Sequence, residues 1–347
     1  MKIGKFFGTV AGAATLGAWV TMQVLRRKRR MDFGDKVVLI TGGSRGLGLI
    51  LARLFLREGA RVAICGRTQA DLDAARDELQ LLGDIRAYRI DLRDLSQIES
   101  LFERVEGDLG PVDVLVNCAA VMTLGPLETM TPADFENEMD IGFRATLHTM
   151  LRAWPGMKER GGGRIVNISS VGGRVALPHL VAYSANKHAV SGLSQGFRVE
   201  LERYGVLVTT VWPMIMRLGS IYSSEVKGQQ KKEWALANLF NSNPLTSISG
   251  ERCAKGIVEA TRVGLATYNP SKRAGFFALA HALAPNVVLE VLSLVPRIWP
   301  GPGREEFNPN EKIKGKELLS PLSPSVLTVL NDAEAVKNNE LNREYSL

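Results

Sequence analysis

The stretch KVVLITGGSRGLG occupies residues 36–48 and joins an apolar run to a glycine-rich turn. Gly42, Gly46 and Gly48 follow the apolar run, and a helix-like stretch begins at Gly48. Glycine suits a loop that turns sharply and approaches a pyrophosphate closely, and the N-terminus of the following helix favours an anion. A glycine triplet by itself is weak evidence, because glycine also marks ordinary turns. Its position between a predicted strand and a predicted helix favours a dinucleotide-binding loop.

Outward from this loop, short apolar runs alternate with longer helix-like stretches along most of the chain. Strands separated by helices of this length predict βαβ units and a parallel sheet. We therefore expect one doubly wound α/β domain of the Rossmann type over residues 31–270. The predicted strands are 36–40, 61–65, 86–90, 112–117, 163–169 and 207–212, and the predicted helices are 48–58, 70–82, 95–106, 134–157 and 182–204.

The first 30 residues predict a membrane anchor with a basic flank. No charge occurs from Phe6 to Leu25, and a helix needs about 20 apolar residues to cross the hydrocarbon core. The next residues are RRKRR, whereas a signal peptide has a shorter apolar region and a small-residue cleavage site. The positive-inside rule places the rest of the chain in the cytoplasm. We expect a single-pass membrane protein whose catalytic domain faces the cytoplasm.

Charge and cysteine content exclude several other classes of protein. The net charge of +7 is concentrated in the basic flank, which favours a membrane partner and argues against nucleic acid. The 347 residues include only three cysteines, too few and too scattered for a disulfide framework or a metal cluster. We therefore expect no metal site.

The C-terminal part predicts two appendages to the domain. Residues 271–300 contain two apolar runs separated by Pro285 and Asn286, and neither run is long enough to span a bilayer. They predict a helical extension that packs on the domain or lies at the membrane surface. Residues 301–347 are polar and predict a partly ordered tail.

Tyr183 and Lys187 stand four residues apart in YSANK on a predicted helix, so both side chains project from one face. A phenol with a pKa near 10 exchanges protons poorly at neutral pH unless a cation stabilises its phenolate, and Lys187 can supply that cation. Such a pair also arises by chance on surface helices. Ser170 lies just past the predicted strand 163–169, at the edge of the sheet where ligands of open α/β folds bind. The three residues together predict a catalytic site.

The glycine spacing Gly-x-x-x-Gly-x-Gly, followed by Ser170, Tyr183 and Lys187 in that order, resembles the short-chain dehydrogenase/reductase family over most of residues 36–260. The resemblance implies that Ser170 holds the substrate carbonyl and that Tyr183 exchanges the proton. It implies that Lys187 lowers the pKa of Tyr183 and binds the nicotinamide ribose. The implied reaction is hydride transfer between NADP(H) and a carbonyl or an alcohol.

The end of the second predicted strand favours NADP(H) over NAD(H). NAD-specific enzymes hold the ribose 2'-hydroxyl with an acidic residue there, whereas this chain has Arg67. Arg67 and Arg45 would neutralise a 2'-phosphate, and the alternative interpretation is a pair of solvated surface arginines. The resemblance also implies that Asp91 accepts a hydrogen bond from the adenine amino group. The expected cofactor-binding residues are Thr41, Gly42, Ser44, Arg45, Gly46, Leu47, Gly48, Arg67, Asp91, Leu92, Asn117, Ala119, Tyr183, Lys187 and Pro213.

Three departures from the family pattern surround the nicotinamide end of the predicted site. Asn117 is followed by Cys-Ala-Ala rather than Asn-Ala-Gly, and Leu218 stands where a threonine is expected after Pro213. Gly142 replaces an asparagine that, in the family, holds a water linking the lysine to solvent. We therefore expect slow proton delivery, and we expect Gly142→Asn to raise turnover if the backbone accepts a side chain.

Two functions remain open from the sequence. One is an NADP(H)-dependent reductase, and the other is a protein that binds NADP(H) in a structural or sensing role with little or no turnover. With a membrane anchor nearby, the expected substrate is a lipophilic carbonyl, and a second copy of the chain is a candidate partner. His179 lies near Tyr183 but is expected to be a bystander. Residues 220–249 are expected to form a lid whose apolar side chains line a pocket or pack on the core: Tyr222, Trp234, Leu236, Leu239 and Phe240.

Overall fold

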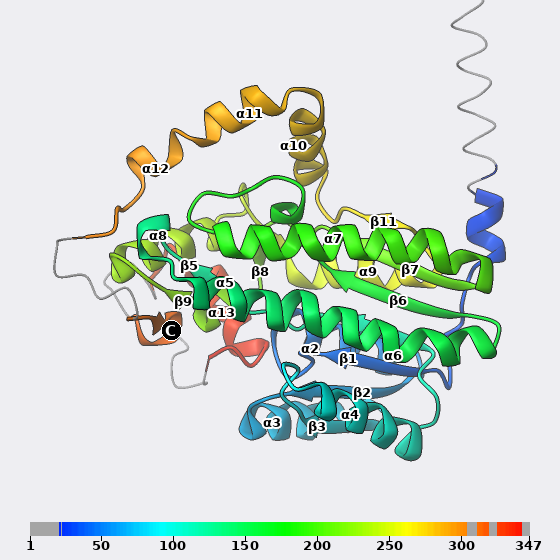
Figure 1. Ribbon diagram of the computed structural model, residues 1–347. Helices are drawn as coiled ribbons and strands as arrows, with labels where there is room; N and C mark the ends of the chain where they lie inside the picture. Colours follow the sequence, from blue (N-terminus) through cyan, green and yellow to red (C-terminus); the bar gives the residue numbers. More distant parts are fainter. Residues whose placement is uncertain (1–20, 22, 304–310, 319–324, 342–347) are drawn as a thin grey trace, which may run out of the picture.

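The computed structural model describes residues 21, 23–303, 311–318 and 325–341. Seven parallel strands form its main sheet in the order β11-β7-β6-β4-β1-β2-β3 (Figure 1). The strand order reverses between β1 and β4, as in a doubly wound sheet, so the predicted fold class is confirmed. The strands are β1 (Val37–Thr41), β2 (Arg61–Gly66), β3 (Ile85–Arg89), β4 (Val114–Asn117), β6 (Gly163–Ile168), β7 (Val206–Val211) and β11 (Thr267–Tyr268).

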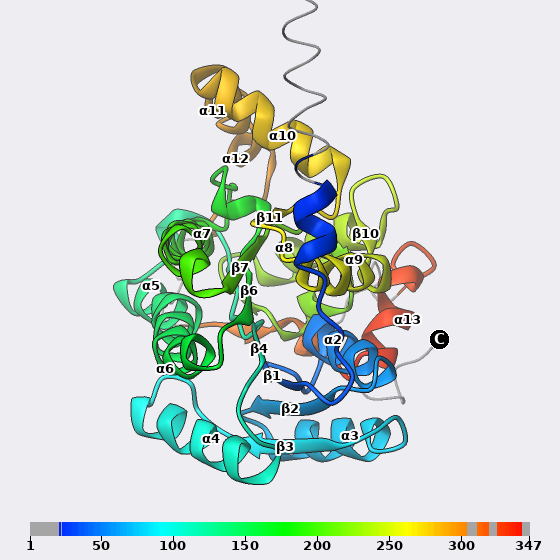
Figure 2. The same ribbon diagram turned by 90° about the vertical axis from the view of Figure 1, so that its right-hand side faces the viewer.

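Helices cover both faces of this sheet (Figure 2). Because both faces are buried, the central strands carry continuous apolar runs rather than an alternating pattern. In β1, Val38 and Ile40 pack into one core cluster, and Val37 and Leu39 pack into the cluster on the opposite face. One face is covered by α2 (Gly46–Arg57), α3 (Gln69–Leu79) and α9 (Gly250–Arg262), and the other by α4 (Leu95–Asp108), α6 (Ala145–Glu159) and α7 (Val181–Leu201).

The helix predicted over residues 134–157 consists of three segments in the structure. The first is α5 (Pro132–Glu138), which begins where the Thr131 backbone N–H donates to the Asp134 carboxylate at 2.8 Å. A π-helical turn follows over Met139–Arg144, and α6 continues from Ala145. The periodicity of the sequence does not reveal a π-helical turn, because the residues on either side remain helical. Such turns are frequent at functional sites.

The predicted lid and parts of the predicted tail form one substructure. The lid helix α8 (Gln230–Ser242) packs against the tail helix α13 (Val329–Lys337). Tyr222 and Trp234 are fully buried in a third core cluster, with ring centroids 5.2 Å apart. For these two residues the structure therefore favours packing over pocket lining. A second sheet of three short strands also joins lid and tail: β5 (Thr123–Leu124), β9 (Glu225–Val226) and β12 (Ile313–Lys314).

The apolar extension forms an arm that projects from the domain (Figures 1 and 2). It comprises α10 (Lys272–Leu283), α11 (Pro285–Leu292) and α12 (Val295–Ile298). The last two contain no buried residue, so their apolar side chains are not packed on the domain. Within the described part of the chain, no single helix has the length and apolar composition to cross a bilayer. Two successive segments, Lys272–Leu283 and Pro285–Ile298, meet those criteria jointly, but they are bent by 116°.

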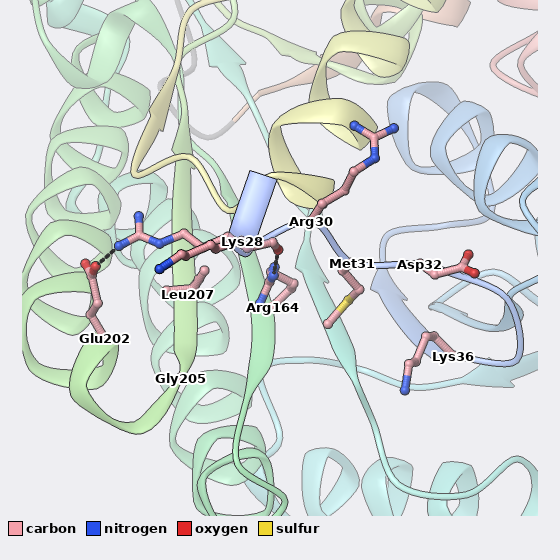
Figure 3. Close-up of a pocket in the computed structure, with 10 residues that line it drawn as sticks. Lys28, Arg30, Met31, Asp32, Lys36, Arg164, Glu202, Gly205 and Leu207 are labelled. Atoms are coloured by element: carbon pink, nitrogen blue, oxygen red, sulfur yellow. Dashed lines mark hydrogen bonds and ion pairs between the residues drawn. The ribbon is translucent and has the colours of Figure 1, made fainter. Parts of the chain in front are cut away.

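The predicted anchor over residues 6–25 lies mostly outside the described residues, whereas its basic flank is described. Residues 23–28 are helical. Arg29 then pairs with Glu202, and Arg30 pairs with Glu259 at 3.0 Å. The flank borders a hollow of about 540 Å³ beside the amino-terminal ends of β6 and β7 (Figure 3). This hollow lies at the edge of the sheet opposite the predicted site. Residues of the flank and of the domain line it together, so it marks the place where the flank contacts the domain.

A buried ion pair joins the lid to α5. Lys227, directly after β9, and Asp134 are both buried, and the ammonium group contacts the carboxylate. Although burial alone would raise it, the pKa of Asp134 lies below its usual range because Lys227 and Thr131 donate to the carboxylate. Removing one partner of such a pair leaves a buried charge without compensation.

We expect Lys227→Ala to lower the free energy of unfolding by about 3 to 5 kcal/mol, the usual cost of breaking a buried pair. Denaturant unfolding measures this change. Lys232→Ala is the control, because Lys232 is exposed and its ammonium donates to the neighbouring Gln229 side chain, and its effect should stay within about 0.5 kcal/mol. Equal losses in the two variants would contradict a stabilising role for the buried pair.

Candidate active site

A cavity of about 650 Å³ opens at the carboxyl edge of the main sheet, where the strand order reverses. Ligands of open α/β sheets bind at this place, and the volume is typical of small-molecule sites. The glycine loop lines one part of the cavity and the predicted catalytic residues line another. All but two of the predicted site residues contribute to its wall: Gly42, Ser44, Arg45, Gly46, Leu47, Gly48, Arg67, Asp91, Leu92, Ala119, Ser170, Tyr183, Lys187 and Pro213.

The two exceptions, Thr41 and Asn117, lie behind the cavity wall. The Thr41 hydroxyl accepts hydrogen bonds from the backbone N–H groups of Cys118 and Ala119, at 3.1 and 3.2 Å. The Asn117 amide donates to Asn167 at 2.9 Å, and its oxygen accepts from Thr149 at 2.7 Å. Both residues therefore fix the ends of β1 and β4 instead of facing a ligand.

The glycine loop has the geometry that a dinucleotide requires. Gly42 has a φ of +67°, and a Cβ there would lie 2.8 Å from the Cα of Ala119. A Cβ on Gly48 would lie 2.2 Å from the carbonyl oxygen of Gly42. The first turn of α2 contains no acidic residue, so its N-terminus favours an anion. The loop therefore fits the pyrophosphate of a nicotinamide dinucleotide.

The charged residues predicted at the adenosine end line the same cavity. The Arg45 guanidinium lies 3.9 Å from the carboxylate of Asp71 and 3.8 Å from that of Glu340. Asp91 accepts hydrogen bonds from Arg93, which hold the pKa of this carboxyl below its usual range. Its carboxylate is thus ionised and engaged with Arg93, and the contact with adenine stays a prediction.

Residues 338–341 of the tail lie against the glycine loop, which the polar composition of the tail did not predict. The Gly46 backbone N–H donates to the carbonyl oxygen of Asn338 at 2.9 Å. The Asn339 side chain donates to the carbonyl oxygen of Ser44 at 3.0 Å. Next in the chain, Glu340 is buried between the loop and the lid. Burial raises the pKa of this carboxyl, even though Arg45 lowers it.

The predicted catalytic residues come from the segment after β6 and from α7. Ser170 lies two residues past the end of β6, where its hydroxyl accepts from the Gly172 backbone N–H at 3.1 Å. Tyr183 and Lys187 lie on α7, and the lysine Nζ is 5.5 Å from the centre of the tyrosine ring. The Lys187 ammonium donates to the carbonyl oxygen of Ile168 at 3.0 Å. The end of β6 therefore holds the lysine beside the tyrosine.

The pKa of Tyr183 differs from the expectation that Lys187 lowers it. Burial raises the pKa of Tyr183 to about 12, with smaller raising contributions from Glu138 and Cys118 and a lowering one from the Ser170 hydroxyl. Burial also lowers the pKa of Lys187, which weakens this cation. Tyr183 is therefore a neutral phenol at physiological pH and is suited to donate a proton.

Gly142 lies in the π-helical turn and faces Asn186 of α7. A Cβ on Gly142 would lie 2.0 Å from Nδ2 and 2.3 Å from Oδ1 of Asn186. In Gly142→Asn the new side chain and Asn186 would compete for one space, so the expectation that this change raises turnover stays a prediction that depends on where the Asn186 side chain moves. Asn186 belongs to the motif YSANK and directly precedes Lys187, so its proximity to the site was visible in the sequence. Its role was not.

Among the remaining candidates from the sequence, His179 and the five apolar lid residues do not line this cavity, whereas Leu218 does. His179 is buried, and its Nδ1 lies 2.7 Å from the Glu233 carboxylate, which agrees with the bystander interpretation. Leu218 is buried at the cavity wall and offers no hydroxyl where a threonine was expected. None of the five apolar lid residues contributes to the described wall, namely Tyr222, Trp234, Leu236, Leu239 and Phe240.

Comparison with known proteins agrees with this geometry. A family model described as short chain dehydrogenase matches residues 36–227. The chain is 31% identical over 205 residues to "Dehydrogenase/reductase SDR family member 7C" of Xenopus tropicalis, which covers 57% of this chain and 66% of that protein. It is 33% identical over 182 residues to "3-ketodihydrosphingosine reductase" of Bos taurus, which covers 51% of this chain and 55% of that protein. The chain thus spans less than two thirds of the length of each of these relatives.

Among solved structures, the chain is similar to a short-chain dehydrogenase from Streptomyces avermitilis. The TM-score is 0.66 at 25% identity, and the match covers 76% of this chain and 97% of that one. The shared part therefore amounts to nearly all of a complete domain of this type.

We expect Glu340→Gln to tighten the binding of NADPH at neutral pH. The amide keeps the size of the side chain but removes a negative charge close to the glycine loop, an effect of about 1 kcal/mol or roughly five- to tenfold in Kd. Because burial raises the pKa of Glu340, the parent carboxyl becomes neutral sooner as the pH falls, so the difference between the proteins should shrink at acidic pH. Calorimetric titration at several pH values measures this effect. Glu290→Gln on the projecting α11 is the control, and equal Kd values for the parent and Glu340→Gln at neutral pH would contradict the prediction.

Proposed function

The chain belongs to the short-chain dehydrogenase family, and we propose that it is an NADP(H)-dependent oxidoreductase that interconverts a carbonyl and an alcohol on a lipophilic substrate. The observation that carries this proposal is the convergence of Ser170, Tyr183 and Lys187 on the cavity that the glycine loop also lines. A dinucleotide loop alone would suit a binding protein. A neutral phenol and a buried lysine beside it add the means to move a proton.

The side chains divide the chemistry among themselves. A bound nicotinamide dinucleotide would supply or accept the hydride. The Ser170 hydroxyl would donate a hydrogen bond to the carbonyl oxygen and orient it. Tyr183 would then give its phenolic proton to that oxygen, and Lys187 would stabilise the phenolate that remains. Tyr183 is protonated across the physiological range, as the reduction of a carbonyl requires.

The preference for the phosphorylated cofactor rests on Arg67. This side chain lines the cavity at the end of β2, where a carboxylate would favour NAD(H). A guanidinium there can pair with a 2'-phosphate. Arg45 faces Glu340 and Asp71, so its availability to the cofactor depends on the tail. Arg67 is therefore the primary determinant in this proposal.

The lipophilic substrate is proposed from the wall beyond the catalytic residues. Met122, Met214 and Met216 line this part of the cavity, and methionine forms adaptable apolar surfaces. The bovine relative is a 3-ketodihydrosphingosine reductase by name, which refers to the reduction of a sphingoid ketone. A long-chain carbonyl compound would fit both observations.

We also propose that the protein is held at a membrane, with residues 6–25 as a single-pass anchor and the catalytic domain on the cytoplasmic side. The arm of α10–α12 supports a second contact with the bilayer, because it exposes Phe276, Leu283 and Ile298. The arm projects on the same side of the domain as the helix over residues 23–28 (Figures 1 and 2). Apolar helices in this position would lie in the bilayer interface.

The alternative function is a protein that binds NADP(H) with little or no turnover. The observation that favours it is the burial of Glu340 against the glycine loop, where a carboxylate opposes phosphate binding. This alternative does not explain why Ser170, Tyr183 and Lys187 lie together at the cavity that the glycine loop lines. Turnover measurements separate the two functions.

We expect the full-length protein in detergent to oxidise NADPH with long-chain aldehydes or ketones, and Tyr183→Phe to lower kcat by about 10²- to 10⁴-fold, the usual worth of general acid–base catalysis. NADPH affinity should change little, because the ring remains. Tyr204→Phe is the control, since this ring stacks on Trp154 away from the cavity. NADPH binding without turnover in the parent protein, and equal binding by Tyr183→Phe, would favour the alternative function.

We expect the parent protein to bind NADPH more tightly than NADH, and Arg67→Asp to weaken NADPH binding by about 10- to 100-fold, as a lost charged hydrogen bond of roughly 1.5 to 3 kcal/mol predicts. The same change should leave NADH binding unchanged or improved, because Asp accepts from a ribose hydroxyl. Arg203→Asp on the far edge of the sheet controls for net charge. Equal Kd values for the two cofactors in the parent protein would refute the preference.

For the membrane, we expect the full chain to sediment with intact microsomes and its domain to be digested by added protease. A chain that begins at Met31 should still bind vesicles weakly, and Leu283→Asp with Ile298→Asp should abolish that binding. Val199→Asp is the matched control, because Val199 on α7 is as exposed as Leu283, at 78%. A soluble full-length chain would contradict the membrane anchor. Vesicle binding that the double variant retains would contradict the contact through the arm.

A further inference from the structure

A cluster of buried polar groups lies behind Lys187, away from the cavity wall. It brings together Gly142 of the π-helical turn, Asn186 of α7 and Glu138 at the end of α5. Asn186 and Glu138 have no exposed surface. The Asn186 amide lies within 2.3 Å of the position of a Cβ on residue 142. One amide thus occupies the space that a side chain at position 142 would need, but it is carried by α7.

Three of the four polar side-chain atoms of Asn186 and Glu138 have no hydrogen-bond partner among the described residues. Neither Nδ2 nor Oδ1 of Asn186 forms a hydrogen bond there. Glu138 accepts from the Thr123 backbone N–H at 2.8 Å through Oε1, while its Oε2 has no partner among the described residues. A buried polar group without a partner costs about 1 to 3 kcal/mol, so such groups usually have a specific reason. The Asn186 amide and the Glu138 carboxyl are two such groups beside a catalytic lysine, which suggests a role in proton transfer.

The charges around Glu138 allow it to hold or release a proton near neutral pH. Burial raises the pKa of Glu138 to about 7, with a smaller raising contribution from Glu225 of β9 and lowering contributions from the Thr123 N–H and Lys187. The Asn186 amide also lowers it, although the geometry of the pair falls short of a hydrogen bond. Burial lowers the pKa of Lys187, and Glu138 raises it. The lysine and the glutamic acid are therefore brought closer in proton affinity than they are in water.

We propose that Asn186 is the positioning residue that replaces the amide missing at position 142, and that it holds Glu138 as the proton source behind Lys187. In each reduction, Tyr183 gives one proton to the substrate oxygen and regains one from the Lys187 ammonium. Lys187 then regains a proton from the Glu138 carboxylic acid, and Glu138 regains one from water. The proton count balances, and no further reactant is required. This inference rests on the proposed reductase function.

Because residue 186 carries the amide in place of residue 142, glycine is needed in the π-helical turn. Any side chain at position 142 would displace the Asn186 amide and separate Lys187 from Glu138. A second amide at position 142 is therefore useful only where residue 186 is small. The two positions should behave as alternatives, which a pair of single variants and their combination can reveal.

The test compares Asn186→Ala, Gly142→Asn and the double variant in the full-length protein, with long-chain aldehyde and NADPH. Asn186→Ala should lower kcat by about tenfold or more, part of the 10²- to 10⁴-fold typical of general acid–base catalysis, with KM for NADPH unchanged. Gly142→Asn should also lower kcat. The double variant should recover most of the parental kcat, because it restores one amide in the same space.

The pH profile provides a readout that a purely structural role would not move. In the parent protein, kcat for reduction should fall as the pH rises through about 7, because Glu138 then loses the proton that it must donate. Glu138→Gln should lower kcat and remove this falling limb of the pH profile, which is the decrease of kcat with rising pH. Asn186→Asp, which keeps the shape of the side chain, should move the limb to higher pH, because a second carboxylate raises the pKa of Glu138.

Thr261→Val on α9 is the stability control, since it removes a buried hydrogen bond to Ile257 far from the cluster. It should lower the melting temperature without changing the pH profile. A parental kcat and pH profile in Asn186→Ala would overturn the inference, as would a double variant that folds but stays as slow as the single ones. Should the double variant not fold, an unchanged limb in Asn186→Asp overturns the inference and a shifted limb supports it. A parent protein without carbonyl turnover overturns the proposed function itself, and the inference with it.

Discussion

The close approach of the β1 and β4 ends is the constraint on which the rest of the site depends. Gly42 and Ala119 lie too near each other for any side chain at position 42, and Thr41 ties the two chain segments together through two backbone N–H groups. This contact fixes the glycine loop at the point where the strand order reverses. The cavity, the start of α2 and the ends of β6 and α7 all take their positions from that junction. A dinucleotide site is the consequence of this geometry, because the backbone, and not a set of side chains, shapes its phosphate end.

Burial of polar groups then sets the chemistry at the other end of the cavity. The same burial that raises the pKa of Tyr183 and Glu138 lowers that of Lys187, so Lys187 and Glu138 are closer in proton affinity than they are in water, whereas Tyr183 and Lys187 are further apart. The tail applies a related effect to the phosphate end through Glu340. The protein therefore contains two buried carboxyls next to one ligand cavity, one behind the catalytic residues and one beside the glycine loop. They give the two ends of the site different responses to pH.

Much of the fold and most of the site were predictable because they depend on local sequence. The apolar runs and the glycine spacing predict the sheet, and the YSANK motif places Tyr183 and Lys187 on one helical face. What the sequence did not predict depends on contacts between distant segments. Asn339 reaches Ser44 across 295 positions, and no pattern in a polar tail signals this contact. The fit of Asn186 into the space beside Gly142 likewise depends on how a π-helical turn packs against α7. The pKa of Tyr183 was misjudged because the spacing reveals a nearby cation but not the degree of burial.

The central claim is that this buried Ser-Tyr-Lys arrangement transfers a hydride and a proton to a carbonyl compound, and isotope transfer tests it most directly. The full-length protein is mixed with NADPH that carries deuterium in both positions at C4 of the nicotinamide, together with a long-chain aldehyde, and the lipid fraction is analysed by mass spectrometry. The account predicts an alcohol with one deuterium on the carbon that was the carbonyl carbon, formed in amounts above one equivalent per protein. Stoichiometric binding of the labelled cofactor, with no deuterium in any alcohol, would contradict it.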